Sequence, residues 1–150
     1  MYFYLIIIFS LAVDLATKIA VRANMALGEK TELWGGVIQL SHLANTGSSG
    51  NMFHGMGRLL AVVVLILVGL AFYLRSRGKF QGALSQVGLS LFIGGALGNV
   101  IDRIVYNQVT DFLYFDESAT MNFADIWVFI GIVMMVLGNI VAKRRTAASN

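Results

Sequence analysis

Four stretches of the chain are almost entirely apolar, and polar segments separate them. They cover residues 2–20, 59–74, 84–101 and 123–142. A helix needs roughly 20 apolar residues to cross the hydrocarbon layer of a membrane, and a helix satisfies its own backbone hydrogen bonds there. The pattern therefore predicts an all-α membrane protein with four transmembrane helices.

The composition supports this prediction and excludes other classes of protein. Hydrophobic residues make up 57% of the 150 residues, charged residues make up 13%, and the mean hydropathy is +0.75. Soluble domains carry about 25% charged residues, and disordered chains are polar and rich in charge. The chain has no cysteine, so it has no disulfide and no thiolate ligand or nucleophile. We expect residues 1–150 to form a single integral-membrane domain.

Charged residues are divided unequally between the two ends of these helices. Segments 75–79 and 143–145 hold six of the 11 basic residues and no acid. Because short cytoplasmic segments are enriched in Lys and Arg, both segments are expected on the cytoplasmic side. An even number of spans places the N-terminus there as well, with outer loops at 21–58 and 102–122. The eight acidic residues fall in these loops or near the outer ends of the adjoining helices.

The first outer loop is long enough to fold. Residues 31–34 and 37–43 flank Gly35-Gly36, a pattern typical of two short strands joined by a tight turn. We therefore expect a small β-rich extracytoplasmic cradle between the first and second transmembrane helices. Trp34 suits a membrane interface, because its apolar ring and its N–H donor favour different phases.

Two ionisable residues lie within the first apolar stretch, where a charge costs roughly 2.5–3.5 kcal/mol. Asp14 and Lys18 are one helical turn apart, in the acid-before-base order that favours an ion pair. We interpret them first as structural support for the bundle, with a direct chemical role as the alternative.

The third apolar stretch ends in a mixed segment of glycines and polar residues. Gly94, Gly95 and Gly98 offer a surface on which another helix can pack closely. Three polar residues follow at helical spacing: Asn99, Asp102 and Arg103. Because the last two lie on different parts of the helix surface, we expect each to have a partner of its own.

Two further aspartates lie on either side of one short loop. Asp111 follows the third stretch and Asp125 begins the fourth, so the two helices can bring both carboxylates together at the outer membrane boundary. An acid at a helix N-terminus is common in its own right. Two adjacent carboxylates, however, share one proton, and such a pair can activate water while protonating a substrate carbonyl. The spacing favours an aspartic protease.

Other chemistries have weaker support. His42 and His54 lie in the first outer loop without an HExxH motif, so a zinc protease is not indicated. The Gly47–Gly50 segment contains a G-x-S-G string, but a serine nucleophile needs a base and no apolar stretch contains a histidine. There is no phosphate-binding loop and no basic aromatic surface for nucleic acid.

Five segments together resemble the motifs of lipoprotein signal peptidase, or signal peptidase II, in the family's order and over nearly the whole chain. They are Asp14-Leu-Ala-Thr-Lys18, Asn45-Thr-Gly47, Gly94–Arg103, Val109-Thr-Asp-Phe112 and Asn122-Phe-Ala-Asp125. The resemblance implies a four-span aspartic peptidase of the bacterial inner membrane that needs no metal or cofactor.

The resemblance also implies roles for single residues. Asp111 and Asp125 occupy the positions of the catalytic pair. Four residues match polar positions lining the family's active site: Asn45, Asn99, Arg103 and Asn122. Further positions that bind substrate or support the site are Asp14, Lys18, Gly47, Gly98 and Asp102.

The implied substrate is a prolipoprotein whose lipobox cysteine already carries diacylglyceryl, cut on the N-terminal side of that cysteine. Membrane lipids and globomycin-like peptide inhibitors are the other partners that the family implies. Since a lipid-modified substrate must enter from the side, we expect residues 30–58 to move as a lid.

Some residues depart from the family pattern. Ser48-Ser-Gly50 stands where Ala-Ala and an aromatic are usual, Met121 replaces an aromatic residue, and Ser118–Met121 lacks a common proline. The altered Ser48–Gly50 segment leaves open a catalytically weak homologue that binds lipopeptide as a scaffold. Another alternative is a small transporter that uses Asp14, Lys18 and the outer acids as a proton relay. The transporter lacks the inverted repeats common in such folds.

Overall fold

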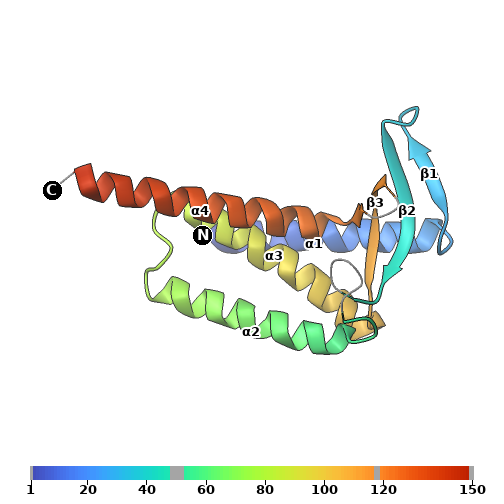
Figure 1. Ribbon diagram of the computed structural model, residues 1–150, viewed down its shortest axis with the longest axis horizontal. Helices are drawn as coiled ribbons and strands as arrows, with labels where there is room; N and C mark the ends of the chain where they lie inside the picture. Colours follow the sequence, from blue (N-terminus) through green and yellow to red (C-terminus); the bar gives the residue numbers. More distant parts are fainter. Residues whose placement is uncertain (1, 48–52, 117–118, 149–150) are drawn as a thin grey trace.

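The structure, a computed structural model, describes residues 2–47, 53–116 and 119–148. Its elements in chain order are α1 (Tyr2–Asn24), β1 (Lys30–Leu33), β2 (Ile38–Asn45), α2 (Gly57–Ser76), α3 (Gly82–Tyr106), β3 (Val109–Asp116), β4 (Ala119–Met121) and α4 (Phe123–Ala148). The helices run side by side and the strands lie across one end of them (Figure 1). The start of α1, the end of α4 and the α2–α3 connection lie at the other end.

Four helices are long and apolar enough to cross a membrane, as predicted. Their outward faces carry large apolar side chains, among them Phe9, Ile66 and Phe129, which are 63%, 65% and 70% exposed. Such surfaces suit contact with lipid. The protein is a multi-pass membrane protein.

The helices extend further than the apolar stretches predicted. α1 continues to Asn24 and α3 to Tyr106. Residues 102–106, expected in the second outer loop, therefore form the end of α3, which includes Asp102 and Arg103. These polar residues can continue the helix because they form hydrogen bonds with α1, with β3 and with the segment after β2.

α3 is the central helix and packs against the other three. Its glycines allow this closeness, as expected for small-residue surfaces. A Cβ on Gly95 would lie 2.5 Å from the carbonyl oxygen of Ala124 in α4, and one on Gly94 would strike Ser10 in α1. The predicted packing role of the Gly94–Gly98 segment is confirmed.

The cradle is a four-stranded antiparallel sheet in the order β1-β2-β3-β4. The predicted hairpin is present, with the turn at residues 34–37 and positive φ at Gly35 and Gly36. The cradle is not confined to the segment between α1 and α2, however, because β3 and β4 come from the loop between α3 and α4. β2 and β3 pair across the two loops, and this pairing places the sheet at the ends of α3 and α4.

Candidate active site

Asp111 lies on β3, where only 4% of its surface is exposed. Leu43 pairs with Asp111 and Asn45 pairs with Val109, so Asn45 is the diagonal neighbour of Asp111 on the same face of the sheet. The Asn45 Nδ2 atom donates to Asp111 Oδ2 at 2.9 Å. Asn122 donates to the other carboxylate oxygen at 2.6 Å, so both oxygens are engaged.

Asp125 is fixed by the way α4 begins. The Asn122 side chain accepts a hydrogen bond from the Asp125 backbone N–H at 3.0 Å, and the Asp125 carboxylate accepts one from the Asn122 N–H at 3.2 Å. This reciprocal pattern is a capping box. The buried Asn122 side chain also bonds Asp111, so one residue joins the two aspartates.

Lys18 determines how Asn99 is oriented. The ammonium of Lys18 has donors only, and its Nζ lies 2.8 Å from Asn99 Oδ1. The Asn99 amide nitrogen therefore faces the other way and donates to Asp125 Oδ1 at 2.8 Å. A buried charge on α1 thus fixes a hydrogen bond to an aspartate on α4.

Asp14 secures the same region from α1. Its carboxylate lies 2.8 Å from Lys18 Nζ, and both side chains are fully buried. The other carboxylate oxygen accepts the Ala124 N–H at the start of α4 at 2.8 Å. A Cβ on Gly98 would collide with the Asp14 carboxylate. The predicted ion pair is present, and it positions α4 as well as Lys18.

Asp102 and Arg103 have separate partners, as predicted from their positions on the helix surface. Arg103 donates to the carbonyl oxygen of Gly47 at 3.3 Å, and its Nε is buried without a hydrogen-bond partner among the described residues. Asp102 accepts bonds from Arg22 at 3.0 Å and from the Thr110 N–H at 3.0 Å.

Arg22 and Thr110 were not among the residues predicted from the sequence. The available signal was spacing, because Asp14, Lys18 and Arg22 follow each other at intervals of one helical turn and therefore share a face. Nine of the 11 residues selected from the sequence lie on the helices and strands that meet at this end of the bundle: Asp14, Lys18, Asn45, Gly98, Asn99, Asp102, Arg103, Asp111 and Asp125. The other two lie directly beside these elements, Gly47 after β2 and Asn122 between β4 and α4.

The environment of Asp111 favours its protonated form. Burial and, after it, the charge of Asp125 raise the pKa of the Asp111 carboxyl, which lies at about 6 instead of 3.8. Hydrogen bonds from Asn45 and Asn122 and the charge of Lys18 act in the opposite direction. A carboxyl group with this pKa beside a second carboxylate is the arrangement expected of a pair that shares a proton.

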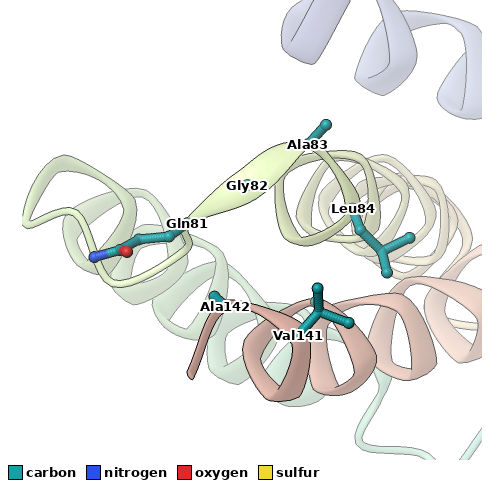
Figure 2. Close-up of a pocket in the computed structure, with 7 residues that line it drawn as sticks. Gln81, Gly82, Ala83, Leu84, Val141 and Ala142 are labelled. Atoms are coloured by element: carbon teal, nitrogen blue, oxygen red, sulfur yellow. The ribbon is translucent and has the colours of Figure 1, made fainter. Parts of the chain in front are cut away.

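The cavity between the start of α3 and the second half of α4 does not contribute to this site. It has a volume of about 480 Å³ and lies between Gln81–Leu84, at the start of α3, and Gly138, Val141 and Ala142 of α4 (Figure 2). It is at the opposite end of α3 from Asn99.

Residues 48–50, which carry the serine alternative, lie outside the described residues. Within the described part of the chain, no three His, Cys, Asp or Glu side chains are grouped as they would be around a metal ion.

Comparison with known proteins identifies the family. The family model for signal peptidase II matches residues 6–141. The chain belongs to the signal peptidase II family. It is therefore a protease, and the aspartic class is consistent with this family.

Relatives of this family match the chain from end to end. The lipoprotein signal peptidase of Gloeobacter violaceus is 36% identical over 150 residues, covering 98% of this chain and 86% of the relative. The Listeria monocytogenes protein of the same name is 31% identical, with 97% of each chain covered. A solved bacterial membrane enzyme has the same fold, with a TM-score of 0.86 at 24% identity, covering 99% of this chain and 92% of that one.

Proposed function

We propose that this protein is the membrane aspartic endopeptidase that removes signal peptides from lipoprotein precursors. The precursor would carry diacylglyceryl on its lipobox cysteine, and cleavage would occur on the N-terminal side of that cysteine. The observation that supports this most directly is Asn122, whose one side chain contacts both Asp111 and the Asp125 backbone at the start of α4. Family membership supports the substrate class.

The two carboxyl groups would divide the chemistry between them. Asp111, which is buried and has a raised pKa, would hold the proton and donate it to the carbonyl oxygen of the scissile peptide. Asp125, which is partly buried, would be the base that takes a proton from the attacking water. The hydrogen bonds from Asn45, Asn99 and Asn122 hold both groups in place before substrate arrives.

The location of the pair suits a substrate that remains in the membrane. Both aspartates lie where the sheet meets the ends of α3 and α4 (Figure 1). We place this end at the outer face of the bacterial inner membrane, with both termini in the cytoplasm. Diacylglyceryl chains would stay in the lipid while the peptide enters from the side, and residues 30–58 would move to admit it.

Cleavage of a diacylglyceryl-modified prolipoprotein by the purified protein in detergent tests the proposal. We expect the wild type to cleave, and Asp111→Asn to lose at least about 1,000-fold in kcat, since the Asn side chain cannot supply the proton. Glu29→Gln changes an exposed acid before β1, outside residues 30–58, and serves as the matched control with full activity.

Full cleavage by Asp111→Asn would contradict the assignment of the pair. Binding of the precursor without turnover by the wild type would instead revive the scaffold alternative. That alternative rests on Ser48–Gly50, which lies outside the described residues, and family membership does not favour it.

A further inference from the structure

Arg22 links three elements behind the active-site strand. It lies in the last turn of α1, and its NH1 atom donates to Asp102 Oδ1 on α3 at 3.0 Å and to Thr110 Oγ1 on β3 at 2.8 Å. The guanidinium also lies over the Tyr106 ring, 4.6 Å from its centroid. A planar guanidinium suits this task because its donors have fixed directions.

Thr110 is held at two points by this arrangement. Arg22 binds its hydroxyl, and Asp102 Oδ2 accepts its backbone N–H at 3.0 Å. The Asp102 carboxylate is buried, with its other oxygen bonded to Arg22. Two bonds at different atoms of one residue restrain both the position and the rotation of the strand there.

Thr110 immediately precedes Asp111. Side chains of consecutive strand residues point to opposite faces, so the bonds from Arg22 and Asp102 hold the back of β3 while Asp111 points toward Asn45 and Asn122. Restraint on Thr110 therefore limits how far the Asp111 carboxylate can move away from Asn122.

We infer that Arg22 is a positioning residue for the aspartate pair, acting through Asp102 and Thr110 rather than through contact with substrate. This inference rests on the proposed function, since it gives Arg22 a part in the same reaction. It adds to that function a residue on α1 whose charge is used to orient β3.

The test compares Arg22→Met with Arg22→Lys and with a matched control, Arg75→Met. Arg75 resembles Arg22 because it is partly buried, lies over an aromatic ring, that of Phe3, and donates to a side chain of α3, that of Gln86. It lies at the other end of the bundle. Two readouts are measured for each purified protein: hydrogen exchange of residues 109–116, and kcat and KM for lipopeptide cleavage.

Arg22→Met should speed exchange in β3 and lower kcat about 10-fold to 100-fold with KM within about 2-fold, because misplaced catalytic groups slow chemistry more than binding. Arg22→Lys should recover part of kcat, since one ammonium can still bond Asp102 or Thr110. Arg75→Met should leave kcat and β3 exchange unchanged.

Three results would overturn the inference. One is unchanged β3 exchange together with unchanged kcat in Arg22→Met. Another is a raised KM with kcat intact, which would make Arg22 a substrate-binding residue. The third is an equal loss in Arg75→Met, which would indicate general destabilisation. Failure of the proposed function is distinguishable, because the wild type would then not cleave at all, whereas the exchange of β3 would still report the restraint.

Discussion

Three asparagines hold the two carboxylates, and their neighbours fix the orientation of two of them. Asn99 must present its oxygen to the donor-only Lys18, which leaves its nitrogen for Asp125. Asn122 must present its oxygen to the Asp125 N–H, which leaves its nitrogen for Asp111. Neutral amides can stabilise charge on either aspartate without adding a charge of their own, so the pair retains its capacity to share one proton.

The raised pKa of Asp111 predicts a pH dependence for catalysis. Its pKa of about 6 means that the acid member loses its proton as the pH rises through that value. We expect kcat/KM to fall on the alkaline side of about pH 6. Stability should also decrease as the pH rises. Between pH 3.8 and about 6, the Asp111 carboxyl holds its proton more often in the folded protein than in the unfolded chain. Its contribution to the free energy of unfolding therefore falls as the pH rises through this range.

Asn45→Ala should move the descending limb of this profile to higher pH. The hydrogen bond from Asn45 lowers the pKa of Asp111, so its removal raises that pKa. The pH profile of kcat/KM measures the shift. Asn24→Ala removes an exposed amide that bonds only the carbonyl of Ala20 among the described contacts, and it should leave the profile in place. A limb that stays fixed or moves to lower pH in Asn45→Ala would contradict the assigned cause.

Site residues could be predicted from the sequence where a charged or polar residue stands in a segment that is otherwise apolar. Asp14 and Lys18 are conspicuous in an apolar helix, and Asp111 and Asp125 flank one loop. Thr110 carries no such signal, because threonine is ordinary in a strand. Its partners are Asp102 on the preceding helix and Arg22, which lies 88 residues away in the chain.

Gly98 shows how the helices depend on one missing side chain. It lies where α3 passes the buried Asp14–Lys18 pair, and an added Cβ would collide with the Asp14 carboxylate. Gly98→Ala should lower the free energy of unfolding by about 1–3 kcal/mol, the usual cost of overpacking. Cleavage activity should fall as well, because Asp14 also holds the Ala124 N–H at the start of α4.

Thermal unfolding in detergent measures the first effect. Gly69→Ala is the matched control, because a Cβ on Gly69 in α2 would meet nothing within 4 Å, and alanine favours a helix over glycine. Equal melting temperatures for the two alanine variants would contradict the proposed collision.

The strands show why one half of the sheet could be predicted and the other could not. β1 and β2 are joined by a short turn with two glycines, and the local pattern contains all that the hairpin needs. β3 lies in a short apolar run around Asp111 whose strand character depends on pairing with β2, from the other outer loop. That pairing is a long-range contact, and no local periodicity reports it.

At the scale of the whole molecule, the basic segments and the sheet lie at opposite ends of the helix bundle. The basic segment 75–79 runs from the last turn of α2 into the α2–α3 connection, and segment 143–145 lies near the end of α4. Both are at the end of the bundle away from the sheet (Figure 1). Asp111 and Asp125 lie at the sheet end. The proposed function requires the sheet end to face outward, because a precursor with a lipidated cysteine presents its cleavage site on the outer side of the membrane.

The orientation can be measured directly because the chain has no cysteine of its own. Val37→Cys places one thiol at the exposed tip of the β1–β2 hairpin, and Lys79→Cys places one in the α2–α3 connection. In intact spheroplasts a membrane-impermeant maleimide should label Cys at position 37 and should label position 79 only after permeabilisation. The reverse pattern would place the aspartate pair on the cytoplasmic side. That result would contradict both the positive-inside rule and the proposed choice of substrate. Labelling at both positions before permeabilisation would instead show leaky cells, which a cytoplasmic marker enzyme in the medium detects independently.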